Sequence, residues 1–301
     1  DYKKRLSQLH TVLGVCDHFV GEDYDASKDH LEEAISISEK VSDLLSFVLG
    51  NYWIACLYAW NGEFEESYLH FSKALKLSEA GNNVLGIVGA KSTVAITYYW
   101  NGKIDSAYKV SVEALHTAEE IHDLYPEGLS FTGHGVSCFG KGYLQLAVEH
   151  LLKAVDYCAR CYNPFWISLS RFTLGDAYFE LEEYKASQRS NNEARAVLED
   201  YEIMPSFSSL CKVASMRAKL RNKEGDVDLK SVFKWYDEHK GRLFDGWMAR
   251  YIADILLNMD DRHFSEAEHW LQKAITADSK NDMRWHLGRD YALYGEFFRR
   301  Q

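Results

Sequence analysis

The sequence predicts an all-α protein, a right-handed superhelical solenoid of stacked helix hairpins. Three observations predict it: similar residues recur every forty positions, amphipathic runs flank each recurrence, and Asn-Gly pairs separate some of these runs. Steps of forty from Phe64 reach Tyr24, Ile104, Leu144, Tyr184 and, two steps further, Phe264. A fixed period of this length is typical of a repeat array, in which neighbouring units complete one another's cores.

Each unit is predicted to be a hairpin of two helices, here named A and B in chain order. The runs "LGNYWIACLYAW" and "YLHFSKALKLSEA" on the two sides of Gly62 return apolar residues every three or four positions, which places them on one helix face. The Asn-Gly pairs at 61–62 and 101–102 suit the end of helix A, because glycine tolerates the left-handed conformation there. Small residues such as Ser67 and Ala107 let the two helices approach closely.

The predicted organisation is a single domain over residues 1–301. Its hairpins are expected at about 3–41, 45–81, 85–122, 127–162, 166–202, 206–241 and 245–279, with a half repeat at 282–301. The step to position 224 fails, and "NKEGDVDLK" indicates a sixth unit that is shifted by a few residues. Pro126, Pro164 and Pro205 fall between a B helix and the next A helix, where a missing amide donor does least harm. The next turn glycine would fall one residue after Gln301, so we expect a fragment of a longer protein.

The alternation of small and aromatic residues resembles the tetratricopeptide repeat. The second unit carries it at Ala55, Tyr58, Phe64, Ser67, Phe71 and Ala74. The period is forty instead of thirty-four, which is similar to the helical arrays of large bacterial signalling proteins. Two such groups are the class III adenylate cyclases with a central ATPase and the maltose-activator-like regulators, and "GRDYALYGEFFRR" looks most like the cyclase-associated arrays. The resemblance implies A helices that line a concave surface, and a parent protein with catalytic and ATPase domains.

Composition narrows the function classes. The formal charge of −11 disfavours nucleic acid as a partner. No apolar run approaches eighteen residues, so no membrane span is predicted. Six scattered cysteines, with no charged-then-apolar leader, favour a reducing cytoplasm.

The motifs that carry chemistry favour structural interpretations. "GHGVSCFGKG" has the spacing of a phosphate-binding loop, but Gly142 stands where that loop needs a hydroxyl. Cys158 and Cys161 form a lone CxxC that suits a helix face better than a zinc site. Neither a nucleophile elbow nor a set of histidines with metal spacing is present. We therefore expect no catalytic residue, no cofactor and no metal in this chain.

A partner is expected in the concave groove, at inward-facing positions of the A helices. These positions are Tyr52, Cys56, Trp60, Ile96, Tyr99, Trp100, Phe139, Phe172, Asp176 and Phe179. An exposed aromatic groove would recognise an amphipathic helix, an apolar peptide or a neighbouring domain. The alternative is that these rings form the core between units, and the sequence leaves both open.

A basic segment offers a second candidate surface. It holds Lys212, Arg217, Lys219, Arg221 and Lys223, a local reversal of sign on an acidic chain. A solvated helix face is its usual meaning, and a dock for an acidic partner is the alternative. Taken together, the sequence predicts a non-catalytic protein-interaction, scaffold or regulatory domain, whose partner is a protein, a peptide or another domain of its parent. The alternative function is that of a small-molecule sensor domain.

Overall fold

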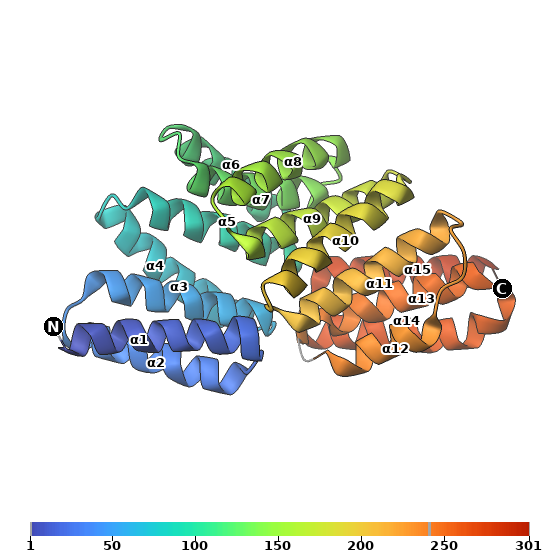
Figure 1. The fold of residues 1–301 in the computed structure, drawn as a ribbon, viewed down its shortest axis with the longest axis horizontal. Helices are drawn as coiled ribbons and strands as arrows, with labels where there is room; N and C mark the ends of the chain where they lie inside the picture. Colours follow the sequence, from blue (N-terminus) through green and yellow to red (C-terminus); the bar gives the residue numbers. More distant parts are fainter. Residues whose placement is uncertain (1, 240–241, 301) are drawn as a thin grey trace.

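The computed structural model describes residues 2–239 and 242–300, and regular structure in these ranges is entirely helical (Figure 1). The helices follow one another as antiparallel hairpins along a curved path from the N-terminus to the C-terminus. The all-α helical repeat solenoid that the forty-residue period predicts is therefore confirmed. Residue 241, where the sixth predicted unit ends, and residues 1 and 301 lie outside the described ranges.

The hairpins alternate A and B helices. The A helices are α1 (Tyr2–Cys16), α3 (Leu44–Trp60), α5 (Val84–Trp100), α7 (Leu124–Gly140), α9 (Pro164–Glu180), α11 (Pro205–Arg221), α13 (Asp245–Met259) and α15 (Arg284–Arg300). The B helices are α2 (Tyr24–Lys40), α4 (Phe64–Ala80), α6 (Ile104–Glu119), α8 (Leu144–Arg160), α10 (Tyr184–Asp200), α12 (Leu229–Glu238) and α14 (Phe264–Lys280). A π-helical turn, η1 (Asp17–Gly21), follows α1, and the 3-10 turns η2 (Arg242–Phe244) and η3 (Asp261–His263) flank α13.

The turns repeat at half the sequence period. From Tyr24 to Tyr184 a new helix begins every twenty residues, and the middle residue of each connecting turn has a positive φ. Glycine occupies this position in three A-to-B turns, at Gly62 and Gly102 of the Asn-Gly pairs and at Gly142 after Lys141. The B-to-A turns adopt the same conformation with Ser42, Asn82, His122 and Tyr162. Backbone bonds such as Glu63 N–H to Tyr58 O (2.8 Å) satisfy the last carbonyls of each helix.

Small residues let the helices of each hairpin approach closely. Ser27, Ser67, Ala107, Ala147, Ser187 and Ala267 are all buried between their A and B helices. Two of the serines also donate to A-helix carbonyls, Ser27 Oγ to Gly14 O (2.7 Å) and Ser67 Oγ to Ala55 O (2.8 Å). The close approach expected from the sequence is thus present, and the hydroxyls of Ser27 and Ser67 keep a hydrogen bond inside the core.

The prolines and the sixth unit refine two expectations. Pro164 and Pro205 are the first residues of α9 and α11, and Pro126 lies in the first turn of α7, so all three lie inside A helices. In the first turn of a helix the backbone N–H groups have no acceptor within the helix, so proline loses no hydrogen bond there. In the sixth unit, Lys223 and Gly225 both have positive φ, and α12 begins only at Leu229. This longer turn explains why the forty-residue step fails there.

The C-terminal half repeat folds back onto the middle of the array. Trp285 of α15 packs on Tyr99 of α5 with ring centroids 4.7 Å apart, and its indole N–H donates to Gly140 O (3.4 Å). The Asn101 amide donates to Asp282 O (3.0 Å) and to Asp282 Oδ2 (2.7 Å). These two residues are 181 positions apart in the chain. The solenoid therefore closes on itself, although solenoids in general contact only adjacent repeats.

Substitutions at two turn glycines test whether this closure contributes to stability. Gly102 and Gly142 have nearly the same φ, +81° and +77°. A Cβ on Gly102 would lie 2.8 Å from Arg284 Cβ, whereas a Cβ on Gly142 would meet nothing within 4 Å. We expect Gly142→Ala to cost about 1–2 kcal/mol of unfolding free energy from backbone strain alone. We expect Gly102→Ala to cost about 1–3 kcal/mol more, from overpacking of the closure contact. Urea denaturation of both variants checks this, and equal losses would contradict a closed array.

Candidate functional site

The first four A helices present equivalent positions to the inner surface. The A helices of neighbouring hairpins pack against one another, whereas the B helices lie outside them (Figure 1). One row of equivalent positions, forty residues apart, is Leu9, Leu49, Gly89 and Leu129. Leu9 is 53% exposed and Leu49 is 41% exposed, whereas Gly89 and Leu129 are buried, so the apolar row is open to solvent at its first two helices. Exposed leucines in register on neighbouring helices indicate a surface that a partner can cover.

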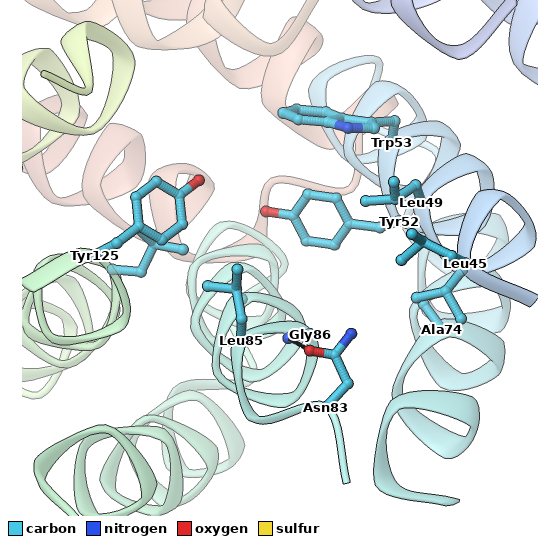
Figure 2. Close-up of a pocket in the computed structure, with 12 residues that line it drawn as sticks. Leu45, Leu49, Tyr52, Trp53, Ala74, Asn83, Leu85, Gly86 and Tyr125 are labelled. Atoms are coloured by element: carbon cyan, nitrogen blue, oxygen red, sulfur yellow. Dashed lines mark hydrogen bonds between the residues drawn. The ribbon is translucent and has the colours of Figure 1, made fainter. Parts of the chain in front are cut away.

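A cavity of about 200 Å³ opens in this row. Its lining comes from α3, α4, α5, α7 and the turn before α5: Leu45, Val48, Leu49, Tyr52, Trp53, Ala74, Asn83, Leu85, Gly86, Gly89, Tyr125 and Leu129. Figure 2 shows Tyr125 on one side, the α3 side chains on the other, and Leu85 between them. The cavity exists because Gly89 has no side chain where the neighbouring helices carry Leu49 and Leu129. We call this feature the Gly89 cavity.

The edge of the cavity is fixed by local sequence. Asn83 caps α5, its Oδ1 accepting from Gly86 N–H (3.1 Å). A Cβ on Gly86 would lie 2.5 Å from Ser78 Oγ, so glycine is needed there for α5 to pack on α4. On the opposite wall the Tyr52 hydroxyl bonds the Thr93 hydroxyl (3.0 Å), and burial raises the pKa of Tyr52 well above its ordinary value. The lining therefore supplies apolar area and neutral polar groups, without a charged side chain.

Five of the sequence-predicted groove residues line a smaller hollow next to this cavity. Tyr52 borders both spaces, and Cys56, Trp60, Ile96 and Trp100 border the hollow, whose volume is only about 20 Å³. Its far wall is formed by Phe19 of η1 together with Phe165, Trp166 and Leu169 of α9. The Trp60 ring is packed edge-on against Trp100, with centroids 5.4 Å apart. The hollow is thus nearly filled by aromatic rings of this chain.

The other five predicted groove residues lie beneath the C-terminal helices. Tyr99, Phe139, Phe172, Asp176 and Phe179 are all buried. Tyr99 and Phe139 contact Trp285, and Phe172 contacts Trp247. The Tyr251 hydroxyl donates to Asp176, whose pKa is raised by burial, and Arg217 stacks on Phe179. In this closed arrangement they pack as core between units, the alternative that the sequence leaves open, and partner binding by them stays a prediction.

The basic segment does not form one face. Lys212 pairs with Glu199 (2.9 Å), Lys219 donates to Asp226 O (2.9 Å), and Lys223 lies exposed in the turn after α11. Arg217 and Arg221 instead point to the inner surface, where they line a polar pocket. A dock for an acidic partner that uses all five residues stays a prediction, and the structure brings together two of them.

Sequence reasoning missed the residues around Gly89. Leu45 and Leu49 lie about one to two helical turns before Tyr52, and Tyr125 and Leu129 lie about three to four turns before Phe139, the predicted groove residue of α7. A signal was present, because Gly89 interrupts an otherwise apolar row at Leu49 and Leu129. A glycine within a helix lowers helix stability by about 1 kcal/mol relative to alanine. A glycine at such a position therefore indicates a packing or functional role.

The glycine-rich segment and the CxxC pair both lie in a packed hairpin of the array. Residues 133–140 of the glycine-rich segment are helical in α7, and Lys141 pairs with Asp105 (2.7 Å). Cys158 is buried against α7, where burial raises the pKa of its thiol to about 12. Over residues 2–239 and 242–300 we find no cluster of three or more potential metal ligands. Within those ranges no helix combines the length and apolarity that crossing a membrane requires.

Comparison with known proteins identifies the fold. Neither a family model nor a curated protein matches the sequence. Among solved structures, the apo form of RapI is similar with a TM-score of 0.65 and 14% identity, over 91% of this chain and 98% of that chain. A Rap protein complexed with competence and sporulation factor is similar with a TM-score of 0.61 and 12% identity, over 91% of this chain and 80% of that chain.

A third similar structure contains tetratricopeptide repeats. It is a STAND signal-transduction ATPase with a tetratricopeptide-repeat sensor, from Pyrococcus horikoshii. Its TM-score is 0.50 and its identity 16%, and the match covers 85% of this chain and 40% of that one. Together with the hairpins and the forty-residue period, these neighbours show that the chain is a tetratricopeptide-like helical repeat solenoid.

Proposed function

We propose that this chain is a non-catalytic recognition domain, which binds a peptide segment of a protein partner on the inner surface of α1, α3, α5 and α7. The Gly89 cavity is the observation that carries the proposal. It opens among exposed apolar residues in register, and its lining offers contact area without a charged or nucleophilic group. A similar fold in a Rap protein complexed with competence and sporulation factor supports a role in recognition.

The size of the cavity favours a side chain over a whole small molecule. Pockets that enclose small ligands usually measure about 300–1,000 Å³. The Gly89 cavity, at about 200 Å³, is smaller and opens to the surface. It therefore suits one large apolar side chain of a peptide whose backbone runs across the exposed residues Leu45, Leu85 and Tyr125 of the lining. This argument places the peptide ahead of the small-molecule sensor at this site.

The expected link to a cyclase or to a maltose-activator-like regulator stays a prediction, since the structural neighbours bear on the helical array alone. A cytoplasmic location is also proposed, because all six cysteines are free and four of them are buried. Free thiols persist where the environment is reducing.

Filling the cavity is expected to abolish anchoring of the peptide. A Cβ on Gly89 would lie 3.8 Å from Leu129 Cδ2 and 4.0 Å from Tyr52 Cε2, which are ordinary contacts. Gly89→Leu should therefore fold while occupying the cavity. Burial of a large apolar side chain is worth about 1.5–3 kcal/mol, so we expect binding to weaken by about ten- to a hundredfold. Fluorescence anisotropy would measure it, with labelled Gly/Ser peptides that carry a single Leu, Phe, Trp or Ala.

Two variants control this experiment. Gly295→Leu adds the same side chain at an exposed helical position of α15 with nothing within 4 Å, and it should leave binding unchanged. Gly89→Ala should narrow the cavity and raise helix stability by up to about 1 kcal/mol. Peptides that bind Gly89→Leu as tightly as the original chain, or a panel in which the Ala peptide binds best, would refute the site.

A further inference from the structure

The arginines of this chain gather in its second half. The sequence has no arginine between Arg5 and Arg160. On the inner surface of α9, α11, α13 and α15, five of them line one pocket of about 460 Å³. These are Arg217 and Arg221 of α11, Arg250 of α13, and Arg289 and Arg299 of α15. Arginine side chains from three different helices thus line one space, which we call the arginine pocket.

Arg217 is held rigidly in this pocket. Its side chain is only 11% exposed, and its Nε donates to Asp254. The guanidinium contacts two rings, with its Cζ 3.5 Å from the centroid of Phe179 and 4.5 Å from that of Tyr251. Its two terminal nitrogens make no hydrogen bond within the part of the chain that the structure describes. An oriented guanidinium with free donors is pre-organised for a planar oxyanion.

Other arginines around the pocket also keep free donors. Arg221 bonds the Tyr184 hydroxyl (3.1 Å) and shares Asp254 with Arg217, at 3.8 Å. Arg289 uses one terminal nitrogen on Glu180. Arg299 has no hydrogen-bond or ion-pair partner among residues 2–239 and 242–300. Since each guanidinium has five N–H donors, most of the donors in this space are uncommitted.

The charge balance of the pocket is positive. Five arginines face four carboxylates in the lining: Glu180, Glu182, Asp254 and Glu296. Arg250 has a partner behind the lining, Asp290 (2.9 Å), and Glu296 likewise has Arg300. Within the lining alone, five guanidinium groups against four carboxylates leave an excess of one positive charge, on a chain whose formal charge is −11. A local excess of this kind attracts an anion to a protein that otherwise repels it.

We propose that the arginine pocket binds a small ligand through a phosphate or carboxylate group. Its volume lies within the range of about 300–1,000 Å³ that encloses small molecules. Phe179 and Tyr184 add apolar area beside the cationic donors. The site uses other residues than the Gly89 cavity, so it stands or falls independently of peptide binding. A chain with both sites would respond to a protein partner and to an anionic metabolite.

The test compares two double variants with equal loss of charge. Arg289→Gln/Arg299→Gln removes two guanidinium groups from the pocket, and Arg160→Gln/Arg262→Gln removes two exposed arginines elsewhere. Calorimetric titration and thermal shift would use inorganic phosphate and succinate as separate probes, at constant ionic strength. We expect one probe to bind and to raise the melting temperature. In the pocket variant its affinity should fall by about tenfold or more, as charged hydrogen bonds are lost.

The outcomes separate the ligand sources and the competing explanations. Binding of phosphate alone assigns a phosphorylated ligand, and binding of succinate alone assigns a carboxylic acid. Absence of binding by either probe, or an equal loss in both double variants, would overturn the proposal. Circular dichroism of all variants verifies that the helices remain folded. Peptide binding at the Gly89 cavity, measured in the same variants, should not change.

Discussion

Replacing Arg250 by leucine is expected to lower the free energy of unfolding by about 3–5 kcal/mol, the cost of leaving a buried charge unpaired. Arg250 is buried on α13, and its Nη1 pairs with Asp290 of α15 (2.9 Å). It also donates to His286 O (3.2 Å) and to His286 Nδ1 (3.0 Å). Asp278 of α14 lies 3.6 Å away, so a single guanidinium connects the last three helices.

The two aspartates explain why the loss is large. Burial and the neighbouring Asp290 raise the pKa of Asp278 well above its ordinary value, which disfavours a second carboxylate charge beside Asp290. Arg250 then balances the negative charge of Asp290. Without Arg250 that carboxylate must take up a proton or remain charged in the core, and either costs free energy.

A double-mutant cycle measures this interaction. Urea denaturation of Arg250→Leu, Asp290→Asn and the double variant should give a double variant more stable than Arg250→Leu alone, because no unpaired charge remains. As a control, Arg262→Leu removes an exposed arginine paired with Asp260, and it should change stability by less than about 1 kcal/mol. Strictly additive losses, or a loss at Arg250 as small as that at Arg262, would contradict the buried pair.

Replacing Trp100 by alanine is expected to cost about 3–5 kcal/mol, as for other large aromatic side chains deleted from a core. Trp100 is only 3% exposed, and its ring packs edge-on against Trp60 of the preceding A helix. It is also one of the residues predicted to contact a partner. Chemical denaturation of the variant therefore separates the two interpretations of the aromatic inner positions.

An exposed aromatic residue provides the control. Tyr201, at the C-terminal end of α10, is 53% exposed, and Tyr201→Ala should change stability by less than about 0.5 kcal/mol. If Trp100→Ala were as stable as Tyr201→Ala, its ring would not belong to the core. A stable Trp100→Ala variant that no longer bound peptide would instead support the groove.

Much of the fold follows from the sequence because the hairpin is a local structure. Phe64 and Ile104 mark the same position in successive B helices, and Gly62 and Gly102 mark the turns before them. The twenty-residue spacing of all turns was harder to predict, since the residue types at the four B-to-A turns do not by themselves indicate a left-handed conformation. These residues are Ser42, Asn82, His122 and Tyr162. These residues adopt it because the packed helices on both sides determine the path of the chain.

The site could be predicted only in part. Periodicity gives the inward direction of Tyr52, Trp60 and Trp100, but it contains no information on what lies opposite them. Closure by Trp285 depends on the summed rotation of several hairpins, and a small error at each turn displaces the final helix. The Gly89 cavity, by contrast, could have been found by aligning Leu49, Gly89 and Leu129. The arginine pocket required the three-dimensional arrangement, because Arg217, Arg250 and Arg289 lie in different repeats.

The contact between Asn101 and Asp282 also limits how this array can change in length. An open solenoid can gain or lose a unit and disturb only the adjacent ones. Here, an additional hairpin inserted between these two residues would move one turn away from the other. The rings of Tyr99 and Trp285 would then no longer pack against each other and would be exposed to solvent. Duplication or deletion of a single repeat is therefore constrained in this protein in a way that simple stacking would not impose.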